Sequence, residues 1–169
     1  MPTSAPSRWK ATRDSVSFRT VQGVDVMHAL FTRSRKPLSR LICSVLGEPV
    51  SHVALLYSEF VIHSNASGLH IETCSTFEKT NEIVYKVRVK GTPSHLFDLL
   101  AKYERSAYDV GALLWLGVSF GLRRIGIALP KVNLWQTTGM FLCTEWATKF
   151  LCGEEDSLIT PYGLYRRLS

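Results

Sequence analysis

The sequence predicts an α+β fold. Two observations favour this class: short β-rich runs with tight connections occupy residues 50–89, and apolar residues recur at helical spacing before and after that block. The chain has 169 residues, of which 46% are hydrophobic. That is enough for one domain with a buried core. We expect a flexible basic arm over residues 1–20 and a single domain over residues 21–169.

The first elements are a short strand and a helix. Gly23-Val24-Asp25-Val26 predicts a turn that leads into the strand. Apolar residues then follow at helical spacing: Leu38, Leu41, Ile42, Val45 and Leu46. Gly47 and Pro49 end this helix.

Four β-rich runs come next, at residues 50–57, 60–64, 69–72 and 83–89, with a turn at 65–68. The last run alternates in the manner of a half-buried strand. One face carries Val84, Lys86 and Arg88, and the other carries Ile83, Tyr85, Val87 and Val89.

The C-terminal part predicts helices. Pro93 begins one, with an apolar stripe of Leu96, Leu99, Leu100 and Tyr103. Residues 110–122 are apolar but too few to span a bilayer, so we expect a buried helix, with a membrane-touching surface as the alternative. Residues 141–151 predict a last helix, whose inward residues are Leu142, Trp146, Phe150 and Leu151.

The composition excludes few functions. A net charge of +6 and a pI near 9.3 suit weak attraction to cell-wall polymer, acidic lipid or nucleic acid, and identify none of them. No aromatic–basic motif supports nucleic-acid binding. The first twenty residues lack the apolar core of a signal peptide. We therefore expect a cytoplasmic protein with four reduced cysteines: Cys43, Cys74, Cys143 and Cys152.

The most informative stretch is SHVALLYSEFVIHS, residues 51–64. A hairpin centred between Tyr57 and Ser58 places His52 directly opposite His63, and a loop over residues 56–59 preserves that pairing. Directly opposed residues share one face of a sheet, with Cβ atoms about 5 Å apart. Such a pair can act as a base and the partner that fixes its tautomer. Two ordinary half-exposed histidines are the structural alternative.

Cys143 is the candidate nucleophile, because it lies at the start of the predicted helix 141–151. A thiol at a helix N-terminus loses its proton more easily, and backbone N–H groups there can stabilise an oxyanion. An inert core cysteine is the alternative. The other three cysteines fit that alternative.

Ser51-His52-Val53-Ala54 and Val61-Ile62-His63-Ser64, followed by Gly68, resemble the histidine half of the NlpC-type cysteine peptidases. In that family a strand beginning S-H-V-G-I carries the base, and a following V-H-A or I-H-S strand carries the third polar residue. Those enzymes place the cysteine first, whereas Phe141-Leu142-Cys143-Thr144-Glu145-Trp146 follows the histidines here. This order resembles the circularly permuted branch, which includes lecithin:retinol acyltransferase-like proteins and several bacterial and phage proteins.

Three further segments extend the resemblance over residues 21–168. They resemble the opening strand, the Y-D motif before the cysteine helix, and the closing T-P-x-x-L-Y: Gly23-Val24-Asp25-Val26, Tyr108-Asp109 and Thr160-Pro161-Tyr162-Gly163-Leu164-Tyr165. The chain departs from the pattern at Thr144, at Trp146 and in the offset of Asp25. His63 also stands where many permuted relatives carry Glu, so Glu72 is the reserve candidate for orienting His52.

The resemblance implies a permuted papain-like fold, with a central antiparallel sheet packed by helices, and a thiol-dependent amidohydrolase or peptidase. Cys143 would attack the carbonyl carbon, His52 would move the proton, and His63 would hold the His52 ring. Tyr108 is a candidate for a second polar contact, with a core tyrosine as the alternative. No metal or organic cofactor is required. A zinc site from His52, His63, His70 and Cys74 matches no common spacing.

The substrate stays open at this point. The unpermuted relatives imply a peptide or isopeptide bond, for example in peptidoglycan, and the permuted relatives imply an acyl-lipid, which Trp115 and the apolar residues 110–122 would suit. We expect amide hydrolysis by a monomer, either cytoplasmic or delivered by a phage, with peripheral membrane contact as an open option. A silent binding or virion protein on the same fold is the alternative class.

Overall fold

A five-stranded antiparallel sheet with helices on both faces forms the centre of the molecule, which confirms the α+β class. The computed structural model describes residues 25–65, 68–103, 107–108, 115, 117–119, 121–123, 125–127, 140–141, 143–154 and 159–169. The arm expected over residues 1–20 and the turn residues 66–67 lie outside these ranges. No helix in the described part of the chain is long and apolar enough to cross a membrane.

The strands of the central sheet run in the order β4-β3-β2-β1-β5, and every neighbouring pair is antiparallel. Their bounds are β1 (Asp25–Ser34), β2 (His52–Tyr57), β3 (Phe60–Asn65), β4 (Gly68–Thr73) and β5 (Asn81–Gly91). A small parallel pair joins β6 (Ala107–Tyr108) to β7 (Met140–Phe141).

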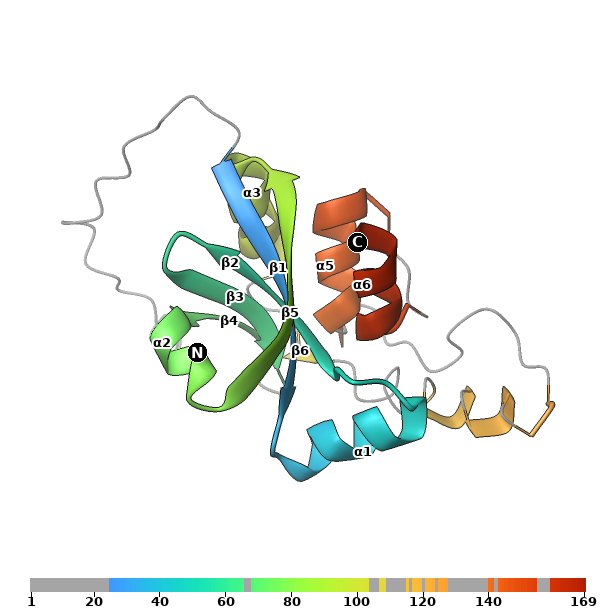
Figure 1. The fold of residues 1–169 in the computed structure, drawn as a ribbon. Coiled ribbons are helices and arrows are strands. Elements are labelled where there is room, and N and C mark those ends of the chain that lie inside the picture. The colour runs from blue at the N-terminus through green and yellow to red at the C-terminus, as the bar shows by residue number, and fades with distance from the viewer. Residues whose placement is uncertain are drawn as a thin grey trace, which may run out of the picture.

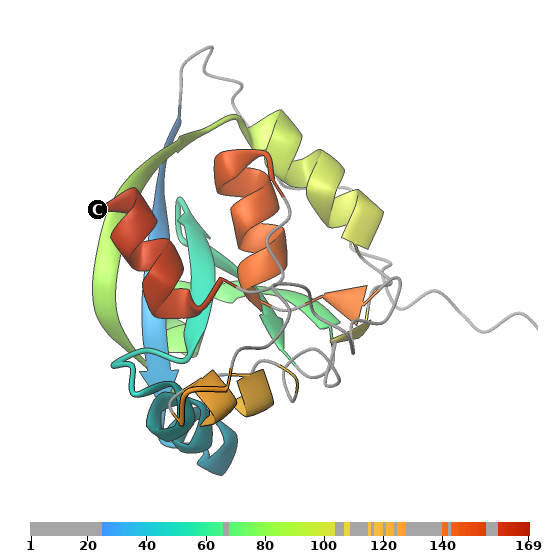
Figure 2. The ribbon, with the colours of Figure 1, turned by 90° about the vertical axis from the view of Figure 1, so that its right-hand side faces the viewer.

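Helices cover the two faces of the sheet unequally (Figures 1 and 2). On one face lie α5 (Cys143–Cys152), α6 (Pro161–Leu168) and α3 (Pro93–Tyr103). The short α2 (Cys74–Glu78) packs on the other, and α1 (Pro37–Leu46) extends from one end of the sheet. Gly47, with φ 68°, ends α1 in the left-handed conformation, as its sequence predicts.

The core divides between these faces. The larger cluster joins Val53 and Leu55 of β2 to Trp146 and Phe150 of α5. The smaller cluster, on the α2 face, consists of Leu30, Ala54, Val61 and Phe77. Since Val53 and Ala54 are consecutive, β2 alternates between the two clusters and is buried on both sides.

Three elements differ from the sequence-based predictions, one in length and two in that they were not predicted. The short opening strand is the ten-residue β1, and neither α2 nor α6 was predicted as a helix. The last long helix begins at Cys143 instead of residue 141, because Met140–Phe141 forms strand β7. Cys143 is therefore the first residue of α5. The expected inward residue Leu142 lies outside the described ranges, while Trp146 and Phe150 are buried.

One predicted strand face was wrong. Ile83 was expected beside Tyr85 and Val87, but it packs with the smaller cluster, and Val84 packs with the larger one. The register of β5 against β1 shifts between Phe31 and Thr32, so that Tyr85 and Ile83 pair with consecutive residues. This bulge moves Ile83 to the opposite face.

Candidate active site

The β2–β3 hairpin brings His52 and His63 together, but not in the predicted register. Ala54 pairs with His63, and Tyr57 with Phe60, so the turn is Ser58–Glu59. Ser58 adopts the left-handed conformation, with φ 55°. Serine does not favour that conformation, so the residue type does not predict a turn here. Direct opposition of the two histidines was therefore wrong. The shift is by two residues, which keeps both side chains on one face as diagonal neighbours.

The two imidazoles are in edge-to-face contact, with ring centroids 5.4 Å apart. His63 also contacts the Phe77 ring, at 5.0 Å between centroids. Phe77 belongs to α2, so both histidines lie on the α2 face of the sheet. His70 of β4 pairs with His63 across the strands, and the centroids of their rings are 6.0 Å apart.

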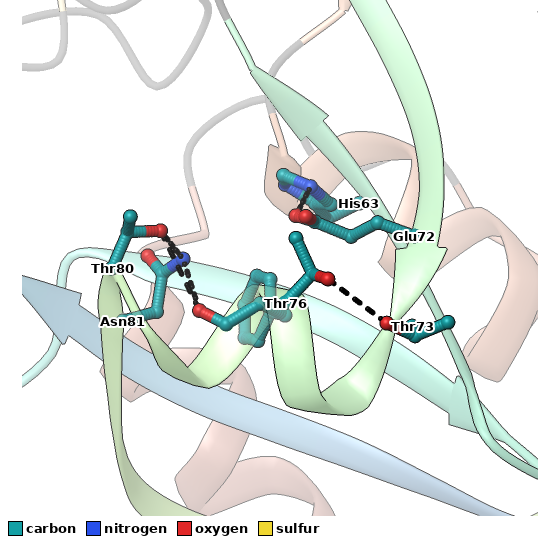
Figure 3. A network of polar contacts seen from close by, with 7 residues as sticks. His63, Glu72, Thr73, Thr76, Thr80 and Asn81 are labelled. Atoms are coloured by element: carbon teal, nitrogen blue, oxygen red, sulfur yellow. Dashed lines mark hydrogen bonds and ion pairs between the residues drawn. The ribbon is translucent and has the colours of Figure 1, made fainter.

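Glu72 of β4 fixes His63. The Nε2 atom of His63 lies 2.9 Å from Oε1 of Glu72, a hydrogen bond that Figure 3 shows from close by. Burial lowers the pKa of His63, and the Glu72 carboxylate acts against that shift. Glu72 was the reserve candidate for orienting His52 itself. It instead orients His63. The three polar groups therefore form a row in which His52 contacts the His63 ring and His63 hydrogen-bonds to Glu72.

His52 is half-buried, yet its Nε2 atom is fully buried and has no hydrogen-bond partner. Burial lowers the pKa of His52 to about 3, and the positive charges of His63, when protonated, and Lys36 act in the same direction. The ring is therefore neutral at physiological pH. An unpartnered buried ring nitrogen is costly in a folded protein, so its retention here calls for a functional explanation.

Cys143 is 5% exposed and shares the larger core cluster with Val53 and Trp146. Burial raises the pKa of its thiol to about 11, and the Glu145 carboxylate adds to that effect. The backbone N–H groups of Val53, Thr144 and Cys143 itself hydrogen-bond to the sulfur and act in the opposite direction. The resting thiol is therefore neutral, with N–H donors already placed around it.

The cysteine and the histidines approach the start of β2 from different sides. The thiol meets the backbone at Val53, one residue after His52, whose side chain leaves the strand on the opposite face to that of Val53. Among the described residues no hydrogen bond joins Cys143 to His52 or His63. The fold thus gathers these residues at one strand end without forming a resting thiol–imidazole bond.

The other expected residues fall outside this cluster. Tyr108 lies in β6, paired with Phe141 of β7, and its side chain is beyond the described part of the structure. Cys43, Cys74 and Cys152 are free and half-buried. Within the described ranges no group of three or more His, Cys, Asp or Glu side chains is arranged to hold a metal ion.

A pocket of about 990 Å³ lies beside α1 and α2, and Lys36 lines it. Glu48 and Pro49 line it as well, so the pocket lies beside the segment that leads into β2 and His52. Lys36 was not among the residues that the sequence predicted at the site. Its only signal was its position directly before Pro37, the first residue of α1, and nothing in that spacing predicts its proximity to β2.

Comparisons with protein-family models, with curated proteins and with solved structures find no match to this chain.

Proposed function

We propose that the chain is a cysteine hydrolase that cleaves an amide bond through a thioester on Cys143, with His52 as the base. The observation that supports this most is the row of polar groups His52, His63 and Glu72, which ends beside the strand residue whose N–H meets the thiol. A neutral imidazole with an unpartnered nitrogen is able to accept a proton.

The chemistry is acyl transfer in two steps. His52 takes the thiol proton, and the thiolate attacks the carbonyl carbon to form a tetrahedral oxyanion near the Cys143 backbone N–H. The C–N bond then breaks as the imidazolium of His52 gives its proton to the leaving amine. Water, deprotonated by His52, attacks the thioester, releases the carboxylic acid and returns the thiol.

His63 and Glu72 are positioning residues in this proposal. The Glu72 carboxylate accepts a hydrogen bond from the His63 Nε2–H, which fixes the His63 ring against His52. A fixed neighbour limits the orientations of the base and stabilises its charged form after proton transfer. The role is analogous to that of any third group that orients a catalytic base.

The resting state must change before the first step, because the thiol and the imidazole are both neutral and share no hydrogen bond. The His52 side chain leaves the strand on the face opposite to the thiol, so this strand end must turn before the imidazole can reach the sulfur. His52 is the first residue of β2 and pairs with Thr32, so the turn disturbs only the end of the ladder. We infer that substrate binding brings His52 to the thiol and completes the pair.

Two observations favour second candidates. Exposed apolar residues of α1, Leu38 and Leu41, favour an acyl-lipid substrate over a peptide. The buried thiol with its raised pKa favours a silent binding protein on the same fold.

Acylation by p-nitrophenyl acetate, followed by intact-protein and peptide mass spectrometry, tests the proposal. We expect one acetyl group on Cys143, lost in Cys143→Ala and strongly slowed in His52→Ala, while the control variants Cys152→Ala and His95→Ala acylate like the wild type. Acetyl groups spread over all thiols, or none, would support the silent binding protein. Turnover of a peptide amide or a short-chain phospholipid ester then separates the two substrate classes.

A further inference from the structure

Five exposed apolar side chains lie on α1 and on the described residues from 117 to 127. Leu38 and Leu41 of α1 are 51% and 60% exposed, and Ile125 is 71% exposed. Val118 and Ile127, from the same segment as Ile125, are also more than 40% exposed. Single exposed apolar residues are ordinary, whereas several on adjoining elements indicate a binding surface.

The two elements that carry these residues lie side by side. A Cβ atom added to Gly117 would be 3.8 Å from Cγ1 of Val45 on α1. Both ribbon views place the orange helical segment against α1, away from the central sheet (Figures 1 and 2). We call this end of the molecule, made of α1 and the described residues from 117 to 127, the α1 face.

The apolar stripe of α1 is wider than the part that the core covers. Ser39 and Leu46 are buried, and Ile42 and Val45 are half-buried. Leu38 and Leu41, on the flank next to Val45, face solvent. A helix that lay only on the core would carry polar residues at those two positions.

Unpaired cations border the apolar residues. Arg35, Lys36 and Arg40 lie on α1 or just before it and are exposed, and Arg123 is exposed on the neighbouring segment. None of the four forms an ion pair with a carboxylate in the described part of the chain. Arg33, by contrast, is held by Glu82 through two hydrogen bonds of 2.9 Å.

The pocket beside α1 is also predominantly basic. Its cations are Arg33, Arg35, Lys36, Arg40 and Lys79. Three carboxylates, from Glu48, Glu78 and Glu82, line it as well, so cations exceed anions by two. A pocket with excess positive charge fits a phosphate-bearing group better than a neutral ligand.

We propose that the α1 face docks on an anionic lipid bilayer. Leu38 and Leu41 enter the boundary between head groups and acyl chains, and Arg35, Lys36 and Arg40 contact lipid phosphates. A second copy of the chain is a poorer occupant, because a symmetric dimer would place these cations against their own copies. The proposal goes beyond the hydrolase chemistry and does not depend on it.

Vesicle flotation of the full-length protein tests this docking. We expect binding to vesicles of phosphatidylcholine mixed with phosphatidylglycerol, weaker binding to phosphatidylcholine alone, and release at high salt. The double variant Leu38→Gln/Leu41→Gln should bind at least about ten-fold more weakly. Arg35→Gln and Arg40→Gln should each cost about five-fold on the anionic vesicles.

Control variants replace other exposed residues, outside the α1 face. Phe97→Gln on α3 and Ile71→Gln on β4 remove apolar side chains that are 43% and 45% exposed, and Lys90→Gln removes a cation of β5. These variants and Cys143→Ala should float like the wild type. Circular dichroism verifies that each variant is folded.

Three results would overturn the proposal. The wild type fails to bind anionic vesicles, or the leucine double variant binds as tightly as the wild type, or the control variants lose binding to the same extent. A lipid-free dimer that Leu38→Gln/Leu41→Gln dissociates, without vesicle binding, would assign the face to a second copy instead. None of these results bears on Cys143 acylation, so failure here and failure of the hydrolase proposal are distinguishable.

Discussion

At the scale of single residues, burial keeps two groups of the candidate site neutral. The imidazole of His52 and the thiol of Cys143 both have their pKa values shifted by burial, the first to about 3 and the second to about 11. The charged form is disfavoured in each case. In the proposed hydrolase, such a neutral pair would leave the thiol weakly nucleophilic until substrate binding rearranges the site.

The low pKa of His52 makes stability depend on pH. The imidazole of His52 has an ordinary pKa of 6.5 in the unfolded chain and a pKa of about 3 in the folded one, so acid favours unfolding. We expect the free energy of unfolding to fall by up to about 1.4 kcal/mol per pH unit on acidification through this window. Urea denaturation between these pH values measures it.

The variant His52→Gln, which cannot be protonated, should flatten this dependence, whereas the control His95→Gln, at an exposed site on α3, should not. The attribution to His52 would be wrong if both variants followed the wild-type slope.

The Glu72 carboxylate should influence the titration of His63. It raises the pKa of His63 against the larger effect of burial. We therefore expect Glu72→Gln to lower the His63 pKa further, since the amide keeps a hydrogen-bonding oxygen but loses the charge. NMR titration of the imidazole signals measures the shift. Glu82→Gln, which removes the partner of Arg33 at the surface, should leave His63 unchanged; an equal shift there would contradict a direct contact effect.

At the scale of elements, one threonine both caps the C-terminal helix and ties it to the segment before β2. The Thr160 hydroxyl accepts a hydrogen bond from the Gly163 N–H at 2.9 Å, which caps α6. The same hydroxyl donates to Oε1 of Glu48 at 2.7 Å. Glu48 lies between α1 and β2, so this contact ties the end of the chain to the segment that leads into His52.

Replacement of Thr160 should therefore loosen both contacts. We expect Thr160→Ala to lower the free energy of unfolding by about 1–2 kcal/mol, while Thr160→Ser, which keeps the hydroxyl, should lose little. Chemical denaturation of the three proteins in parallel measures the difference. Equal losses in the alanine and serine variants would mean that the methyl group, and not the hydroxyl, matters.

Elements differ in how well their sequences predict them. The apolar stripe of α1 and the residues that end it predicted nearly its observed bounds. Gly47 ends the helix because glycine readily adopts the left-handed conformation. The turn at Ser58–Glu59 carries no such signal, so the hairpin register was missed by two residues. The prediction that His52 and His63 share one face was still correct, because a register shift of two residues leaves each side chain on the same face of the sheet.

Contacts between distant elements were less predictable. The helix α6 had recoverable signals, a threonine cap followed by proline. The His63–Glu72 bond had none, since it depends on the register of β3 against β4. The Cys143–Val53 contact depends on how α5 packs on the sheet, which Trp146 and Phe150 determine through long-range burial.

At the scale of the whole molecule, one sheet separates two environments. The α5 face holds Cys143 in the larger core, and the α2 face holds His52, His63 and Glu72. The two meet at the start of β2, close to the basic pocket and the α1 face. A hydrogen bond of 2.6 Å between the Ser39 and Ser51 hydroxyls joins α1 to this strand end, and neither proposal depends on the other.

The central claim is that Cys143 and His52 act as a pair. Labelling by iodoacetamide from about pH 5 to pH 9, with mass spectrometry to locate each adduct, tests it most directly in the wild type and in His52→Ala. We predict that His52 accelerates the reaction of Cys143: although burial keeps this thiol neutral at rest, the Cys143 adduct forms faster near neutral pH in the wild type than in His52→Ala, while Cys43, Cys74 and Cys152 are labelled equally in both. Labelling of Cys143 at the same rate in both proteins would contradict the pairing and identify Cys143 as a core residue.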